Sequence, residues 1–199
     1  MGLISNGTTI FDNGTVNAGG SMKFIKKLTA SSSATLSFVD GSDGVVLDDT
    51  YKEYMFTFKD IHPQTDDVNF SFQVSTDGGS TYSTTVTSTE FIAQQRESDS
   101  TKLEFKGGQA QGTNFQGIFF NTGSDADQNG CGTLQIFNPS SDTFVKHFIG
   151  TFNNYHSLDR TTNFFIGGYF NTTNPVDAVQ FKFSSGNIDA GDICLYGIA

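Results

Sequence analysis

The chain has 199 residues, which fits one large all-β domain, and its formal net charge is −10. Affinity for nucleic acid comes largely from neutralising phosphates, so 21 Asp and Glu against 11 Lys and Arg argue against nucleic-acid binding. Phe occurs 21 times, Gly 22 times and Trp not at all. Because Phe favours strands and Gly favours tight turns, this composition predicts an all-β fold with a sizeable core.

Residues 1–22 are rich in Gly, Asn and Thr and contain few apolar residues. We predict that they form an extended arm that becomes ordered against a neighbouring molecule. Residues 1–30 contain no signal-peptide pattern, and no segment reaches the roughly 18 apolar residues of a membrane-spanning helix. We therefore expect folding in a cytoplasm and no membrane insertion.

Residues 23–199 contain short runs in which apolar and polar residues alternate, as Val68, Phe70 and Phe72 do with Asn69 and Ser71. This period of two is typical of strands with one buried face and one solvent face. The closest approach to a helix is residues 88–99, where the apolar residues are too few to form a stripe. The predicted strands cover residues 23–29, 36–38, 54–59, 68–75, 101–106, 115–120, 132–138, 143–150, 163–170, 179–184 and 193–195.

These runs predict ten to thirteen strands at the spacing of a β-sandwich. We expect one antiparallel, jelly-roll-like β-sandwich over residues 23–199, since no linker or repeat divides the chain. The two cysteines, Cys131 and Cys194, give no disulfide framework, and whether they pair is left open.

Five stretches of the chain together resemble one type of phage protein. They are LTASSSATLSF (28–38), YKEYMFTFKDIHP (51–63), FQVSTDGGSTY (72–82), FNPSSDTFVKHFIG (137–150) and GYFNTTNPVDAVQFKFSSGNIDAGDICLYGI (168–198). The chain resembles the small virion-associated structural or fibre-like proteins of marine tailed bacteriophages, of the cyanophage and pelagiphage type. The resemblance implies assembly in the host cytoplasm, a place on the virion surface, and partners among capsid or tail proteins. It supplies no catalytic residues.

Residues 75–82, with Asp77, Gly79 and Thr81, match the S/T-X-D-X-G-X-T-aromatic pattern of an Asp-box turn. In such a turn the Asp accepts backbone hydrogen bonds and Gly permits positive φ, which would make a hairpin. Sialidases carry several such boxes and three arginines that bind the substrate carboxylate. This chain has one box and only Arg96 and Arg160, so we interpret the motif as structural.

Residues 125–130 reproduce the D-X-D-X-N-G opening of a calcium-binding loop. Asp125, Asp127 and Asn129 would supply hard oxygen ligands. Ile136 stands where such a loop closes with a bidentate Glu, and no flanking helix is predicted. The alternatives are a calcium site on these three residues and a solvated turn with no cofactor.

The inventory of reactive side chains argues against an enzyme. His62, His147 and His156 are far apart and have no Cys or Asp at metal-ligand or triad spacing. We expect His147 to be a structural histidine beside Ile149. Only four Glu are present, and Glu53 and Glu104 are predicted to be solvated, so we expect no pair of catalytic carboxyls.

The aromatic surplus has two interpretations, contacts between subunits or aromatic platforms that bind a glycan, and we favour contacts between subunits. Phe119 with Phe120, and Phe164 with Phe165, are predicted to place adjacent rings on opposite sheet faces, so one ring of each pair would face a neighbour. We expect a homo-oligomer with closed symmetry, with a trimer as the first choice. The predicted function is a non-enzymatic virion structural protein, a capsid decoration or a tail-fibre component. The alternative is a module that binds a receptor or a host surface glycan.

Overall fold

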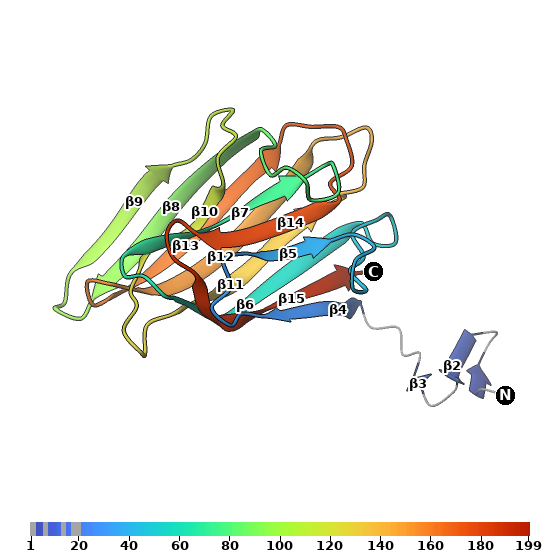
Figure 1. The fold of residues 1–199 in the computed structure, drawn as a ribbon, viewed down its shortest axis with the longest axis horizontal. Coiled ribbons are helices and arrows are strands. Elements are labelled where there is room, and N and C mark those ends of the chain that lie inside the picture. The colour runs from blue at the N-terminus through green and yellow to red at the C-terminus, as the bar shows by residue number, and fades with distance from the viewer. Residues whose placement is uncertain (1–2, 6–7, 13–14, 17–20) are drawn as a thin grey trace.

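The computed structural model describes residues 3–5, 8–12, 15–16 and 21–199, and side chains from residue 21 onward, and these residues form strands and no helix (Figure 1). None of them forms a helix that could cross a membrane. The strands are β1 (Leu3–Ser5), β2 (Thr8–Asp12), β3 (Thr15–Val16), β4 (Met22–Thr29), β5 (Leu36–Val39), β6 (Glu53–Pro63), β7 (Val68–Ser75), β8 (Val86–Arg96), β9 (Thr101–Gly107), β10 (Gln116–Thr122), β11 (Gly130–Phe137), β12 (Lys146–His156), β13 (Arg160–Phe170), β14 (Ala178–Phe183) and β15 (Ile188–Ile198).

Strands β4 to β15 form two antiparallel layers that pack face to face (Figure 1). The large layer has the order β4-β15-β6-β11-β12-β13-β8-β9, and the small layer has the order β10-β7-β14-β5. A single pairing of Thr122 with His156 joins the layers into one twelve-stranded sheet. The prediction of an all-β antiparallel sandwich is confirmed.

The strand pairing is that of a jelly roll, in which the chain pairs with itself as a long hairpin and then rolls up. The nested pairs are β4 with β15, β5 with β14, β6 with β11, β7 with β10 and β8 with β9. These five pairs make ten strands, and in a simple roll β11 alone would lie between β6 and β8; here β11, β12 and β13 take that place as an antiparallel meander. This insertion makes the large layer wider than the small one.

Phenylalanine rings fill the space between the layers. Phe181 of β14 has its ring centroid between 5.2 and 6.3 Å from five others, those of Phe38, Phe56, Phe58, Phe70 and Phe72. Most of these contacts are edge-to-face, the geometry that the aromatic quadrupole favours, and each pair adds about 0.5–1.5 kcal/mol beyond the burial of its area. The period-two pattern of the sequence places these rings on the inner faces.

Lys146, the first residue of β12, is fully buried in the core. Its ammonium group donates to three backbone carbonyls, those of Ser141, Phe144 and Thr172. All three N–H donors are therefore satisfied, which offsets the cost of burying a charge. Burial lowers the pKa of Lys146 from its ordinary value. The Lys146 side chain therefore links the β11–β12 and β13–β14 connections to the start of β12.

The last strands of the large layer, β8 and β9, extend past β10, the edge of the small layer (Figure 1). Strand β9 is therefore exposed or half-buried along its whole length. Strand β8 occupies residues that the sequence did not identify as a strand, because only Phe91 and Ile92 are large apolar residues in its second half. This overhang positions the candidate sites.

Strands β1, β2 and β3 form a separate three-stranded sheet. The predicted extended arm over residues 1–22 falls partly on residues 1–2, 6–7, 13–14 and 17–20, which lie outside the described residues. The arm and its boundary therefore stay predictions. The body begins at β4, whose first residue is Met22.

Candidate functional site

The outer face of β8, β9 and the neighbouring β13 carries a group of apolar side chains, here called the edge patch: Phe91, Leu103 and Phe105, which are exposed, and Phe165, which is half-buried. Leu103 is 78% exposed, Phe105 71% and Phe91 47%. Phe105, Phe91 and Phe165 follow one another across three neighbouring strands. The rings of Phe91 and Phe165 stack with centroids 4.8 Å apart. Contiguous exposed apolar groups of this kind mark interaction surfaces.

The opposite face of β9 is charged. Lys102 and Lys106 both place their ammonium groups near Oε2 of Glu104, at 2.7 and 3.4 Å. Hydrogen bonding to Lys102 is the main reason that the pKa of Glu104 is lowered. In the described sheet β9 pairs with β8 alone. Its other edge therefore offers backbone N–H and C=O groups to a further strand.

A cleft of about 400 Å³ lies between β8–β9 of the large layer and β10 of the small layer. We call it the β8–β10 cleft. The residues that line it are Glu90, Lys106, Gly108, Gln109, Asn114, Phe115, Gln116, Gly117, Phe120 and Asn121. Glu90 is the one carboxyl-bearing residue in this set. The volume of the cleft lies within the range of small-molecule sites, about 300–1,000 Å³.

Glu90 is 3% exposed, and its Oε1 has no hydrogen-bond partner within residues 21–199. Burial raises the pKa of Glu90 to about 7, against a smaller lowering effect of the Lys106 ammonium. A buried carboxyl without a partner costs stability, which makes it a candidate for a binding role. At neutral pH this group can both donate and accept a hydrogen bond, because both protonation states are populated.

Aromatic rings lie on the β10 side of the cleft. Phe120 packs against Phe164 of β13, with ring centroids 5.9 Å apart. A Cβ atom on Gly117 would lie 2.3 Å from the Phe120 ring, so a glycine at this position makes room for the ring. Phe115 is covered by the Lys182 ammonium, 4.2 Å from its centroid. Gln116 is held by Ser88, whose hydroxyl donates to its Oε1 at 2.6 Å. The lining is thus built by packing from both layers.

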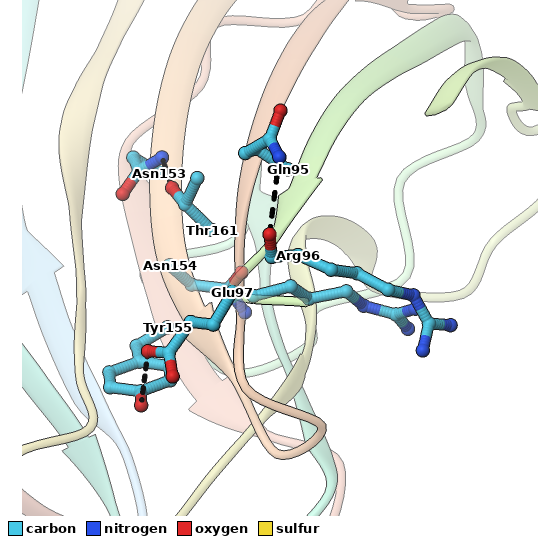
Figure 2. A pocket seen from close by; sticks show the side chains of 8 residues that line it. Gln95, Arg96, Glu97, Asn153, Asn154, Tyr155 and Thr161 are labelled. Atoms are coloured by element: carbon cyan, nitrogen blue, oxygen red, sulfur yellow. Dashed lines mark hydrogen bonds between the residues drawn. The ribbon is translucent and has the colours of Figure 1, made fainter. Parts of the chain in front are cut away.

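A second pocket, of about 370 Å³, lies at the end of β8, β12 and β13 and is here called the Tyr155 pocket (Figure 2). Its polar side chains bind one another. The Tyr155 hydroxyl donates to Glu97 at 3.1 Å, and Asn153 donates to Thr161 at 2.7 Å. The hydrogen bond to Glu97 raises the pKa of Tyr155 to about 12. These four groups have partners, whereas Oδ1 of Asn154 and Nε of Arg160, which also line the pocket, are buried without a hydrogen-bond partner in residues 21–199.

The only two arginines of the chain, Arg96 and Arg160, are direct cross-strand partners on β8 and β13. Neither forms an ion pair with a carboxylate within residues 21–199. In Figure 2 the Arg96 side chain extends away from Tyr155. The Arg160 guanidinium contacts the ring of His156, which is buried. Burial, and then the charge of Arg160, lower the pKa of His156 to about 4, so this histidine is neutral at pH 7.

The predicted calcium ligands lie in the connection between β10 and β11. Asp125 and Asp127 are exposed, and Asn129 is half-buried. Buried Gln128 organises the loop, because its Oε1 accepts from the Asp125 N–H at 3.1 Å and its own N–H donates to the Asp125 carbonyl at 2.8 Å. No group of three or more His, Cys, Asp or Glu that could hold a metal occurs in residues 21–199. Calcium binding at the three residues stays a prediction.

The Asp-box motif forms the expected turn. Asp77 accepts the Thr81 N–H at 2.9 Å and the Thr81 hydroxyl at 2.7 Å, and Gly78 and Gly79 both have positive φ. Hydrogen bonds from Ser75 and Thr81 lower the pKa of Asp77 to about 2. The predicted hairpin is wrong, because the turn leads from β7 in the small layer to β8 in the large layer. Its role is to carry the chain between layers.

The structure confirms some of the other predicted side-chain positions and corrects others. Phe164 is buried and Phe165 faces outward, as expected. The expectation is wrong for Phe119 and Phe120: Phe119 is in the core and Phe120 packs against it, because bulges interrupt the β10 register around them. His147 lies on the same exposed face of β12 as Ile149, and its ring is beside that of Tyr169. Cys131 and Cys194 are free.

The sequence did not identify Glu90, Phe91, Leu103 or Phe105 as functional residues. Leu103 and Phe105 alternate with charged residues in the predicted strand, which signals one apolar face. That face is the outer face of the large layer, because Phe91 and Phe165 alternate with Ile92 and Phe164, which are buried on the inner face. Comparisons with protein families, curated proteins and solved structures found no match.

Proposed function

We propose that this chain is a non-enzymatic structural protein of a bacteriophage virion surface, a capsid decoration protein or a component of a fibre or tail. It acts by packing against copies of itself and against other virion proteins. The observation that carries the proposal is the edge patch, in which Phe91, Leu103 and Phe105 are 47–78% exposed beside an open sheet edge. The assignment to a phage rests on the resemblance of the sequence.

The charges of β9 favour a second copy of the same chain as the partner. When two β9 strands pair antiparallel about Leu103, Lys102 of each lies opposite Glu104 of the other. When they pair about Phe105, Glu104 lies opposite Lys106. Opposite charges directly across a strand pair stabilise it by roughly 0.2–1 kcal/mol, and both registers also join the two edge patches. The sequence K-L-E-F-K is therefore complementary to itself.

The symmetry of the oligomer depends on which edges meet. Pairing of β9 with β9 gives a two-fold dimer. The other open edge of the large layer is β4, where Met22 and Phe24 are 46% and 55% exposed. A head-to-tail contact of β4 with β9 would close a ring such as the expected trimer. The β4 edge carries Lys23, Lys26 and Lys27 and no acid, so it matches β9 less well.

The non-enzymatic proposal is supported by the composition of the cleft. Glycoside hydrolysis uses two carboxyl groups about 5–10 Å apart. In the β8–β10 cleft Glu90 is accompanied by an ammonium group, that of Lys106, rather than by a second carboxyl. The same lining supports the alternative function, a receptor- or glycan-binding module.

Quantitative mass spectrometry of purified phage particles that carry this gene tests the proposal. Detection at a fixed copy number supports it: hundreds of copies indicate shell decoration, and multiples of three or six indicate a fibre or tail component. Absence from washed, intact particles, with the protein recovered only from the infected cell, contradicts it.

A further inference from the structure

We propose that the β8–β10 cleft is a binding site for a neutral, hydroxyl-rich ligand, a sugar unit of a glycan, with Glu90 as the principal hydrogen-bonding residue. The site is distinct from the edge patch and does not depend on assembly through it. Glu90 lines a cavity large enough for a small ligand, and its buried Oε1 has no hydrogen-bond partner within residues 21–199.

The charges that line the cleft select against ionic ligands. An anion would meet the Glu90 carboxyl in a region of low dielectric, and a cation would meet the Lys106 ammonium. Glu90, when ionised, and Lys106 carry opposite charges, so a ligand of either sign is repelled by one of the two groups. A neutral ligand avoids both repulsions and can still bond to both groups.

The hydrogen-bonding groups suit hydroxyls. A hydroxyl donates and accepts at once, and Glu90 at neutral pH can do either. Lys106 adds donors, and Asn114 and Asn121 add amide groups to the lining. A hydroxyl that bonds to Oε1 of Glu90 would give this oxygen a hydrogen-bond partner, which removes the stability cost of burying it without one.

The aromatic wall suits a sugar ring. The Phe120 ring packs against Phe164 and occupies the space that the absence of a side chain at Gly117 leaves. Its position is therefore fixed before a ligand binds. An apolar ring wall beside hydrogen-bonding groups matches a pyranose, which has apolar C–H faces and polar edges. Prior placement of the ring reduces the entropy that binding would otherwise cost.

Ligand-observed and protein-observed NMR titrations of the full-length protein test this inference. The probes are glucose, galactose, mannose and N-acetylglucosamine, with propylamine and acetate as ionic counterparts. We expect at least one sugar to bind with millimolar affinity and to shift the backbone amides of Gly108, Asn114 and Gly117. Glu90→Leu should weaken this binding at least about tenfold, equivalent to about 1.4 kcal/mol.

Glu97→Gln is the matched control, since Glu97 lies close in sequence to Glu90 but lines the Tyr155 pocket. It should leave the sugar affinity unchanged. The inference is overturned if no sugar shifts these amides, if Glu90→Leu and the control bind equally, or if propylamine or acetate binds in the cleft and the sugars do not. The amide shifts of the wild-type protein locate the binding site without any variant. The inference can therefore be tested even if Glu90→Leu fails to fold.

Discussion

Glu90 is a buried ionisable residue whose Oε1 has no hydrogen-bond partner in residues 21–199, so the stability of the fold depends on whether Glu90 is ionised. Its pKa is about 7 in the folded chain and close to the ordinary 4.5 in the unfolded chain. Between these two values the unfolded chain has lost a proton that the folded chain keeps. Ionisation therefore favours unfolding, and stability is lost as pH rises through this window.

Glu90→Gln removes this titration while keeping the shape of the side chain. The free energy of unfolding of the variant, relative to wild type, should rise by about 1–3 kcal/mol between about pH 4 and about pH 8. Urea unfolding at several pH values measures the difference. A constant difference across the range would show that Glu90 ionises normally and has water or another group beside it.

His156 contributes with the opposite sign, because its pKa of about 4 lies below the ordinary 6.5. The charged groups that act on its pKa are Arg160, which contacts it, and Asp67, Arg96 and Lys106. Its contribution to stability is complete above about pH 6.5 and is lost as pH falls through 4. The wild-type pH profile therefore combines two opposing slopes, and the Glu90 variant is needed to separate them.

Among the individual residues, the sequence predicted inward and outward positions well where strands are regular. It placed Phe70, Phe72 and Phe181 correctly because a period of two fixes the face. It failed at Phe119 and Phe120, where bulges turn both rings inward. It also passed over Glu90, because the burial of that residue depends on residues of β10 that are distant in sequence.

At the scale of elements, strands β8 and β12 approach β13 closely at Gly168. A Cβ atom on Gly168 would lie 2.6 Å from the Thr87 carbonyl oxygen and 2.7 Å from the Phe148 ring. A Cβ atom on the adjacent Gly167 would meet nothing closer than 4.0 Å. The two positions therefore form a matched pair on one strand.

Gly168→Ala should lower the free energy of unfolding by about 1–3 kcal/mol, because β8 and β12 must move to admit the methyl group. Gly167→Ala should change it by less than about 0.5 kcal/mol. Chemical unfolding of the two variants side by side measures this. Equal stabilities would mean that β8 and β13 are not packed as described.

The loop between β10 and β11 carries the calcium prediction. If Asp125, Asp127 and Asn129 bind calcium, the melting temperature should rise with calcium concentration and fall with a chelator, following RT ln(1 + [L]/Kd). Asp127→Ala should abolish that difference. Identical melting curves in calcium and in chelator would leave a solvated turn fixed by Gln128.

Element boundaries were less predictable than element positions. The sequence expected a strand from residue 143, but β12 begins at Lys146, because the carbonyls of Ser141 and Phe144 bind the Lys146 ammonium. Strand β8 escaped prediction because Glu90, Gln94 and Arg96 occupy its inner face, where the large layer overhangs the small one. The signal for a strand weakens wherever neither face enters the core.

For the whole molecule, the fold class followed from composition and period, whereas the topology needed the coordinates. Nothing local in the sequence indicates that β11, β12 and β13 together occupy the place of one jelly-roll strand. That insertion widens the large layer, so the small layer does not cover the inner face of β9, and the β8–β10 cleft opens there. The edge patch lies on the outer face of the same strands, which points away from the small layer.

The mass of the isolated protein in solution tests the central claim most directly, namely that the edge patch mediates assembly. Wild type should run as an oligomer by light scattering, and the double variant Leu103→Thr with Phe105→Thr should run as a monomer at the same concentration. Thr keeps the strand preference of β9. Phe144→Thr, at a phenylalanine that is 68% exposed but outside the patch, should leave the oligomer intact. A monomeric wild type at about 100 μM, well above the micromolar range of specific contacts, or an unchanged mass in the double variant, would contradict the account.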